Sequence, residues 1–338
     1  MQGQENRSRK PGAPALRWGF VGTGSIASWM ADCVGRLESA ELVAVASRSR
    51  ESAGAFAERF GAKLAFDDWA ALCAADDVDA VYIATPTALR EEIGIAAARA
   101  GKHVLGEKPF ASCDSLGRIT AACREAGVAF MDATHFVHHP RTAAIRARLA
   151  GDFGWPATVD SAFLIDLPDR GDIRYDPALE PMGAIGDLGW YSVRAALEYR
   201  PPDATAHAVD ARLRRDPESG AAIAGAGVLE FDDGSTSTWT CGFDTGAAVI
   251  ELRLAGPAGV IRVDDFLGQD EDGSAAYRLH ERGEAGTTVR VASDLPGPAL
   301  MFDDFAAAVR EPSLREHWMT ASERTQRLLD AVWAAASG

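Results

Sequence analysis

Short apolar runs alternate with helical patterns through the first 135 residues of the chain. The apolar runs predict strands over 17–22, 41–47, 79–86, 102–109 and 128–134, with a weaker candidate over 63–66. Between them, apolar residues recur at helical spacing over 52–60, 89–100 and 114–126. Gly101 and Gly127 stand where helices end. Because helices that alternate with strands make the strands parallel, the pattern predicts an α/β, doubly wound parallel sheet of the Rossmann type.

The pattern changes near Pro140, where longer β-rich runs begin. These runs predict strands over 156–166, 206–213, 222–231, 235–243, 247–255 and 258–263. Helical patterns cover 186–199, 299–310 and 320–336. We therefore expect three parts: a disordered leader over 1–15, a Rossmann dinucleotide-binding domain over 16–135, and a substrate and dimerisation domain over 136–338. The last domain is α+β with a large, mostly antiparallel sheet, and its final helices can pack back on the first domain.

Composition and charge exclude several classes of protein. No apolar run approaches the roughly 18 residues that span a membrane, and the polar start of the chain lacks the apolar core of a signal peptide. We therefore expect a cytoplasmic protein without a membrane partner. The net charge of −15 would repel a phosphate backbone, which argues against nucleic acid. The five cysteines are odd in number and form no C-x-x-C pair, so buried thiols are favoured over disulfides or zinc.

The first predicted strand leads directly into a glycine-rich turn, GTGSIA at 22–27. This segment fits the G-x-G-x-x-G/A fingerprint of dinucleotide-binding domains. Gly22 would allow the tight turn, Gly24 the approach of the backbone to a pyrophosphate, and Ala27 close packing of helix on strand. The residues between them are Thr23, Ser25 and Ile26. We expect the pyrophosphate to lie at the N-terminus of the helix that begins near Ser25.

The second predicted strand ends in hydroxyl and guanidinium groups. NAD sites usually carry an acidic residue at this point, which holds the ribose 2′-hydroxyl. This chain has Ser47, Arg48 and Arg50 there, and such groups suit a 2′-phosphate. The sequence therefore predicts NADP(H) as the preferred cofactor, with NAD(H) as the alternative. The competing interpretation is that these are solvated loop residues.

An aspartate and a tyrosine stand four residues apart in the segment GAIGDLGWY at 183–191. Asp187 and Tyr191 would share one face of a helix, and Glu107 and Lys108 follow the fifth strand at the carboxyl edge where such sheets bind ligands. A tyrosine can exchange a proton with an alcohol near pH 7 if cations lower its pKa, and Lys108 and an oxidised nicotinamide are suitable cations. We therefore expect a nicotinamide-dependent oxidoreductase with Tyr191 as proton donor; the alternative is that Tyr191 only packs.

Several of these motifs together resemble one family. AGKHVLGEKP at 100–109, GTGSIA at 22–27, ATPT at 84–87 and the glycine-rich segment at 183–191 resemble the Gfo/Idh/MocA oxidoreductases over nearly the whole chain. The resemblance implies hydride transfer between NAD(P) and a sugar or cyclitol, without a metal. Tyrosine at 191 is similar to the branch that contains dimeric dihydrodiol dehydrogenase and glucose-fructose oxidoreductase. The match implies Lys108 and Tyr191 as the catalytic pair, and Asp187 as an assisting residue.

The chain departs from the family pattern at two places. The usual Thr-Pro-Asn-x-x-His is Thr85, Pro86 and Thr87, followed by Arg90 in place of the histidine. The prolyl turn and Glu107 still suit contacts with the cofactor, but Thr87 has no amide to offer. The arginine often found before the His-Pro pair is Val137 here. These changes leave the substrate pocket more open to question than the hydride chemistry.

Candidate substrate residues are fewer and less specific. A metal site at His135, His138 and His139 is rejected, because the resembling family uses none. We expect His135, His138, Arg174 or Trp190 to line the substrate pocket, although core packing or surface exposure is an equal alternative for the histidines. Specificity should depend on the irregular segments 166–182 and 264–275.

The sequence thus predicts an NADP(H)-dependent reductase or dehydrogenase of a sugar or sugar derivative. One alternative is the same chemistry on a non-sugar dicarbonyl or diol, and another is a non-catalytic NADP-sensing regulatory protein. The expected partners are a sugar-like carbonyl or alcohol and a second copy of the chain, as a homodimer or higher homo-oligomer. Substrate identity and reaction direction stay open.

Overall fold

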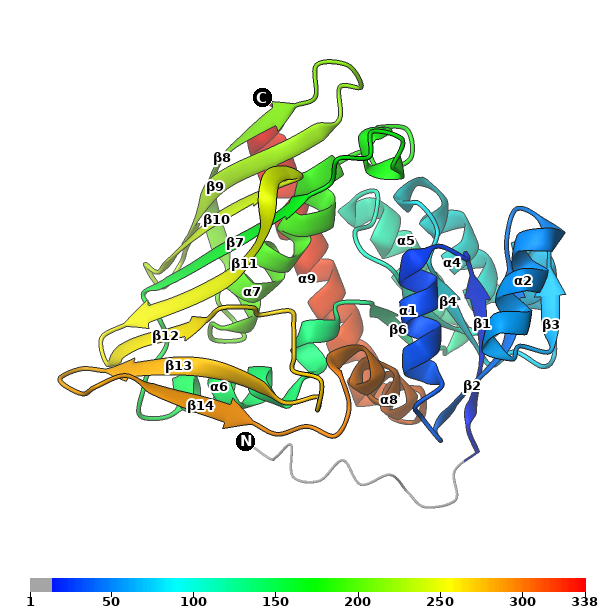
Figure 1. The fold of residues 1–338 in the computed structure, drawn as a ribbon, viewed down its shortest axis with the longest axis horizontal. Coiled ribbons are helices and arrows are strands. Elements are labelled where there is room, and N and C mark those ends of the chain that lie inside the picture. Colours follow the sequence, from blue (N-terminus) through cyan, green and yellow to red (C-terminus); the bar gives the residue numbers. More distant parts are fainter. Residues whose placement is uncertain (1–13) are drawn as a thin grey trace.

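Two sheets lie side by side and are joined by the last two helices (Figure 1). The computed structural model describes residues 14–338, apart from the side chains of His207 and Ala208. Most of the leader that we expected over 1–15 therefore lies outside the described residues. The sequence-based fold class is confirmed: a parallel sheet of Rossmann type is followed by a second, mostly antiparallel sheet.

The first sheet has six parallel strands in the order β3-β2-β1-β4-β5-β6. Its strands are β1 Leu16–Val21, β2 Ala40–Ala46, β3 Leu64–Phe66, β4 Ala80–Ile83, β5 His103–Gly106 and β6 Phe130–Asp132. The order reverses direction between β1 and β4. Ligands of such sheets bind at this point, outside the carboxyl ends of the strands, because the connections there leave in opposite directions.

Helices cover both faces of this sheet. They are α1 Ser25–Val34, α2 Arg50–Phe60, α3 Trp69–Ala74, α4 Arg90–Arg99 and α5 Cys113–Ala126. Ser49 caps α2 and Ser112 caps α5, each accepting a backbone N–H, whereas α1 follows Gly24 without any side-chain cap. The first N–H groups of α1 therefore stay open at the edge where a cofactor would bind.

The second sheet has eight strands in the order β14-β13-β12-β11-β7-β10-β9-β8. They are β7 Thr158–Asp166, β8 Ala206–Arg215, β9 Ala222–Phe231, β10 Thr236–Gly242, β11 Asp244–Gly256, β12 Gly259–Val263, β13 Ala275–Glu281 and β14 Thr287–Val291. The β7–β10 pair is parallel, and the other neighbouring pairs are antiparallel. Sequence analysis missed β13 and β14, because their outward positions are polar and they lie among glycines and charges.

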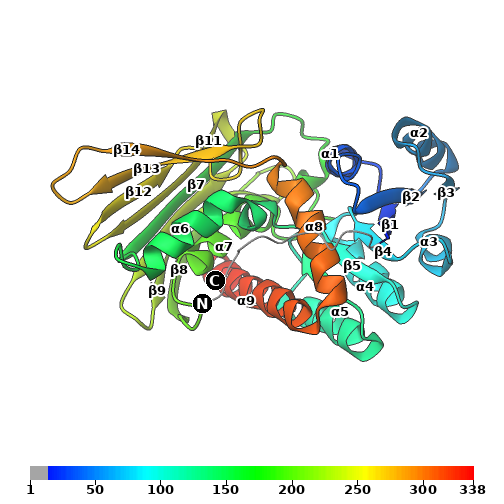
Figure 2. The ribbon, with the colours of Figure 1, turned by 90° about the horizontal axis from the view of Figure 1, so that it is seen from below.

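Four helices complete the described part of the chain. They are α6 Pro140–Ala150, α7 Trp190–Glu198, α8 Gly297–Arg310 and α9 Pro312–Ser337. Helix α9 packs on β8 and α7 in the second domain and also on α5 and β6 in the first. Helix α8 packs on α1 (Figure 2). The final helices therefore fix the two sheets relative to one another. Helix α9 begins eight residues earlier than predicted, where Glu316 pairs with Arg124 of α5 at 2.7 Å.

The helices leave one face of the second sheet uncovered. Thr238, Arg253 and Arg262 are exposed on it, whereas Trp239, Leu252 and Ile261 point to the helices and are buried. Within residues 14–338, no helix has the length and apolar character needed to cross a membrane.

Candidate active site

The site is a cleft between the carboxyl edge of the parallel sheet and the second domain. This interdomain cleft has a volume of about 670 Å³. The first domain lines it with the turn after β1 and the segments after β4 and β5, and the second domain with α7 and the loops 167–182 and 264–270. The two irregular segments in which we expected specificity therefore both reach the cleft.

The glycine-rich turn leaves room at one end of the cleft. Gly22 has φ of +112°, and an added Cβ would lie 2.5 Å from the Ala84 carbonyl oxygen, so only glycine fits there. A Cβ added to Gly24 would meet no atom within 4 Å, and the uncapped start of α1 follows directly. Backbone N–H groups next to open space fit a diphosphate, as the fingerprint predicts.

Polar groups extend this end of the cleft beyond the turn. The Thr23 and Ser47 hydroxyl oxygens lie 3.1 Å apart and join the turns after β1 and β2. Arg48 and Arg50 are exposed at the end of β2, and neither pairs with another residue that the structure describes. Thr85 lines the cleft, and its buried hydroxyl has no partner within the described part of the chain. These groups fit a phosphorylated dinucleotide.

Lys108 and Asp187 form a buried ion pair across the two domains. The Lys108 Nζ donates to the Asp187 Oδ1 at 2.6 Å and to the Asp187 carbonyl oxygen at 2.9 Å. Arg174 Nε donates to the other carboxylate oxygen at 2.6 Å. Burial alone would raise the pKa of Asp187, but the charges of Lys108 and Arg174 outweigh it and hold that pKa well below its usual range. Asp187 therefore stays ionised and fixes Lys108 in place.

Tyr191 lies beside this ion pair on α7. The Lys108 Nζ is 4.8 Å from the centre of the Tyr191 ring, and the ring packs against Phe163 and His135. Burial, followed by the carboxylates of Glu107 and Asp187, raises the pKa of Tyr191 well above its usual value. In the chain without cofactor the cations therefore do not lower this pKa, because burial and the carboxylates outweigh them. The effect of an oxidised nicotinamide stays a prediction. Tyr191 is held in its protonated form.

Glu107 precedes Lys108 and serves a different purpose. It is buried at 5 % exposure and accepts a hydrogen bond from the Tyr82 hydroxyl at 2.6 Å. Burial raises the pKa of Glu107. The carboxyl group thus ties the end of β5 to β4 while it also lines the cleft.

The three histidines occupy three different environments. His135 lines the cleft beside Tyr191, and burial, followed by the charge of Lys108, lowers its pKa to about 3. His138 Nδ1 lies 2.7 Å from the Asp304 carboxylate, and His139 Nε2 donates to the Gly273 carbonyl at 2.8 Å. Within residues 14–338, no group of His, Cys, Asp and Glu side chains is arranged to hold a metal.

Two of the expected substrate residues lie in the core instead. Trp190 is fully buried and donates its Nε1–H to the Thr134 hydroxyl at 2.6 Å. His138 is buried against Asp304 and the Trp318 ring. Neither lines the interdomain cleft, because Trp190 packs on the Phe110 ring and His138 on the Trp318 ring. Arg174 and His135 do line it.

Thr87 and Arg90, which replace the asparagine and histidine of the family pattern, meet at Glu180, a residue that the sequence did not single out. Thr87 donates its N–H to Glu180 at 3.0 Å and its hydroxyl at 2.6 Å. The Arg90 guanidinium lies 3.8 Å from Glu180 and donates to the carbonyls of Thr85, at 3.0 Å, and Pro109. This Glu180 cluster (Thr87, Arg90 and Glu180) ties the loop 167–182 to the first domain. No periodicity marks Glu180, so the sequence offered no signal for it.

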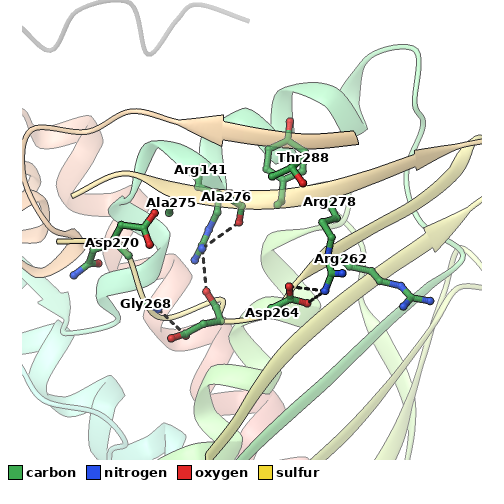
Figure 3. Close-up of a pocket in the computed structure, with 12 residues that line it drawn as sticks. Arg141, Arg262, Asp264, Gly268, Asp270, Ala275, Ala276, Arg278 and Thr288 are labelled. Carbon is green, nitrogen blue, oxygen red and sulfur yellow. Dashed lines mark hydrogen bonds and ion pairs between the residues drawn. The ribbon is translucent and has the colours of Figure 1, made fainter. Parts of the chain in front are cut away.

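Arg141 of α6 positions the other loop of the cleft. Arg141 is 4% exposed, and its guanidinium donates to the carbonyl of Phe266 at 2.6 Å. It also donates to the carbonyl of Asp265 at 2.9 Å (Figure 3). Next to it lies a second cavity of about 400 Å³, whose wall includes the Asp264–Arg278 ion pair. The loop 264–270 separates this cavity from the interdomain cleft, since Asp265 lines both. Sequence analysis missed Arg141.

Comparison with known proteins places the chain in one family. An oxidoreductase family with an NAD-binding Rossmann fold, GFO/IDH/MocA, matches residues 16–134, and the C-terminal domain of the same family matches residues 142–262. The chain belongs to this family and is an NAD(P)-dependent oxidoreductase. The resemblance seen in the sequence is confirmed.

Several relatives share most of the chain. D-xylose 1-dehydrogenase (NADP(+)) 2 of Haloferax volcanii is 36% identical over 68% of this chain and 70% of its own. A dTDP-3,4-didehydro-2,6-dideoxy-alpha-D-glucose 3-reductase of Streptomyces antibioticus is 32% identical over 96% of this chain and 98% of its own. Among solved structures, the 3-ketoreductase KijD10 of Actinomadura kijaniata, in complex with NADP and TDP-benzene, superposes with a TM-score of 0.87 at 29% identity, covering 95% of this chain and 98% of its own.

The depressed pKa of His135 predicts a pH-dependent contribution to stability. The unfolded chain binds a proton at this histidine below about pH 6.5, whereas the folded chain stays neutral down to about pH 3. Stability is therefore lost as the pH falls through this window. When the pH falls from 6.5 to 5, the unfolding free energy of the wild type should drop. The His135→Asn variant lacks this titrating group, so we expect its drop to be smaller by about 2 kcal/mol. Urea titrations at both pH values measure this, with the exposed His280→Asn as control; parallel losses in all three proteins would contradict it.

The Glu180 cluster predicts a large effect of a small substitution. Glu180→Gln removes the carboxylate beside Arg90 and leaves a buried guanidinium without an ionic partner. We expect the unfolding free energy to fall by about 2 kcal/mol, measured by urea denaturation at pH 7. The control is Asp210→Asn, which breaks an ion pair with Arg212 whose side chains are 76% and 81% exposed, and should change stability by less than about 0.5 kcal/mol. Equal effects of the two substitutions would refute the prediction.

Proposed function

We propose that this protein transfers hydride between NADP(H) and a carbonyl or alcohol carbon of a sugar or sugar derivative, with Tyr191 as proton donor and Lys108 as its assistant. The observation that carries the proposal is the meeting of these two side chains in the interdomain cleft. They come from different domains, the Lys108 Nζ lies 4.8 Å from the Tyr191 ring, and the glycine-rich turn lines the same cleft.

In the direction of reduction, the bound cofactor would supply a hydride to the carbonyl carbon. The negative charge that develops on the carbonyl oxygen needs a proton, and the neutral Tyr191 hydroxyl is the donor. An ammonium group has three N–H donors, and Asp187 accepts from the Lys108 Nζ at its carboxylate and at its carbonyl. One N–H is left for the substrate oxygen. Asp187 would act by holding the Lys108 ammonium in this orientation.

Support also comes from the relatives. KijD10 has been solved with NADP, and variants with one tyrosine replaced by phenylalanine or one lysine replaced by alanine or glutamate have been solved with TDP-benzene and NADP. The Haloferax volcanii relative is a D-xylose dehydrogenase that uses NADP(+). The sensor alternative is disfavoured here, because a protein that only binds NADP has no use for a lysine and a protonated tyrosine in its cleft.

For the cofactor, we propose NADP(H), held at the start of α1 and by Arg48 and Arg50. Thr85 and Pro86 would contact its nicotinamide end, as would Glu107, whereas Thr87, which we expected there, gives its N–H and hydroxyl to Glu180. Two guanidinium groups without a carboxylate partner in the described part of the chain suit a 2′-phosphate, which carries close to two negative charges.

We also propose that a second copy covers the open face of the eight-stranded sheet. The register places Arg212, Ala226, Thr240, Ala162 and Glu251 in one row across this face. The centre of the row is small and uncharged, while its ends carry opposite charges. A two-fold axis through the centre would bring the arginine of each copy to the glutamate of the other.

Tyr191→Phe tests the proton donor. Without the hydroxyl, we expect kcat to fall about 10²- to 10⁴-fold, while the NADPH dissociation constant stays unchanged. NADPH absorbance is followed with pooled ketoses, aldoses, keto-sugar nucleotides and α-dicarbonyls. Tyr199→Phe removes the hydroxyl of a buried tyrosine outside the cleft and should keep full turnover. Full turnover by Tyr191→Phe would remove Tyr191 from this role.

Arg48→Ala tests the cofactor preference. Loss of a charge-assisted hydrogen bond to the 2′-phosphate should weaken NADPH binding about tenfold or more and leave NADH binding nearly unchanged. Fluorescence titration of both dinucleotides gives the ratio of the two dissociation constants. Arg59→Ala, on the same helix as Arg50, serves as the charge-matched control. A ratio unchanged from wild type would overturn the assignment.

A further inference from the structure

The cations in the interdomain cleft are all engaged with carboxylates. Within the described residues, the cleft is lined by three, namely Lys108, Arg174 and Arg90. Lys108 and Arg174 share Asp187 at 2.6 Å each, and Arg90 lies 3.8 Å from Glu180. A phosphate at any of them would have to share the cation with a carboxylate that already offsets its charge. The cleft therefore offers no ready partner for a phosphate on the substrate.

The acidic groups of the cleft outnumber these cations. Asp172 shares Arg174, and Asp265 faces the cleft without an ion pair to its carboxylate within the described chain, since Arg141 donates to its carbonyl oxygen instead. The Asp265 Oδ1 instead accepts the N–H groups of Leu267 at 3.1 Å and Gly268 at 2.8 Å. A carboxylate without an ion-pair partner repels a diphosphate, but its free oxygen is a good acceptor for hydroxyl groups.

Apolar side chains complete the lining. Trp29 of α1 is 41% exposed and lies edge-on to the His135 ring, and Ile173 of the loop 167–182 is 42% exposed. Both line the cleft. Flat aromatic and aliphatic surfaces suit the C–H face of a sugar ring. Carboxylate acceptors next to apolar surface match a molecule that has hydroxyl groups on its rim and no charge.

We infer that the substrate is an uncharged, hydroxyl-rich sugar or polyol, and that phosphorylated and nucleotide-linked sugars are excluded. This inference rests on the proposed function and separates two kinds of relative. The Haloferax volcanii relative is named for a free sugar, and the Streptomyces antibioticus relative for a dTDP-linked one. By the charges in its cleft, this chain belongs with the first kind.

The test compares free and phosphorylated ligands on the full-length protein. The protein is first saturated with NADPH, so that nucleotides cannot occupy the cofactor site. Thymidine diphosphate is then titrated by calorimetry, and NADP(H) turnover is measured with D-xylose, D-glucose, D-glucose 6-phosphate and UDP-glucose. We expect turnover of free sugars only, and no saturable binding of thymidine diphosphate below about 1 mM at 0.15 M salt.

Two neighbouring substitutions test the cause. Asp265→Asn keeps an acceptor for the two N–H groups but removes the charge in the cleft, and should tighten thymidine diphosphate binding about three- to tenfold. Asp264→Asn makes the same change in net charge on the other side of the loop, where Asp264 pairs with Arg278, and should have no effect. Equal responses of the two variants would contradict the charge argument.

The outcomes separate the two claims. Thymidine diphosphate binding below about 0.1 mM, or a kcat/KM for UDP-glucose above that for every free sugar, overturns the substrate class even if the enzyme is a sugar oxidoreductase. Silence toward every sugar, both with NADP+ as hydride acceptor and with NADPH as hydride donor, overturns the proposed function. In that case, the calorimetric titration and the Asp265→Asn response still decide whether the cleft excludes phosphates.

Discussion

The buried ion pair between Lys108 and Asp187 is the interaction on which the site depends. Lys108 follows the fifth strand of the parallel sheet, and Asp187 precedes helix α7 of the second domain. With 2.6 Å between their charged atoms and little solvent, the pair has a strong attraction, and either partner alone would be an expensive buried charge. The pair therefore holds the two domains together at the bottom of the cleft. It also fixes the position of the lysine over the Tyr191 ring and the charges next to the Tyr191 hydroxyl.

Other polar contacts cross the same boundary and follow the same principle. Asp132, at the end of β6, is almost fully buried and accepts hydrogen bonds from Ser322 of α9 at 2.6 Å and Arg194 of α7 at 3.3 Å. The Glu180 cluster does the same at the other side of the cleft. Each of these charges has a partner from a distant part of the chain. The two domains are therefore held in a defined relation, as a site with contributions from both requires.

Paired charges also explain why the cleft has a chemical preference at all. A lysine and two arginines in a pocket would ordinarily indicate an anionic ligand. Here their carboxylate partners cancel that field locally, and Asp265 adds a carboxylate that has no ion-pair partner in the described chain. The cleft is consequently polar without being basic, and its carboxylate oxygens can still accept hydrogen bonds from hydroxyl groups. The basic groups without partners lie instead at the end of β2, where a cofactor phosphate is expected.

The sequence by itself determined the fold class and the glycine-rich turn, and it singled out Lys108, Asp187 and Tyr191, which the structure brings to one cleft. These depend on local requirements. They are the apolar periodicity, a backbone conformation at position 22 that only glycine can adopt, and motifs whose residues are neighbours in one turn or one helix. Only the tertiary structure decided that Glu180 joins Thr87 and Arg90, that Arg141 holds the loop 264–270, and that Trp190 is core. It also showed a raised pKa for Tyr191 in the chain without cofactor. The hydrogen bonds behind the first three findings join residues 56 to 124 positions apart, and no local pattern records which distant side chain will meet a given group.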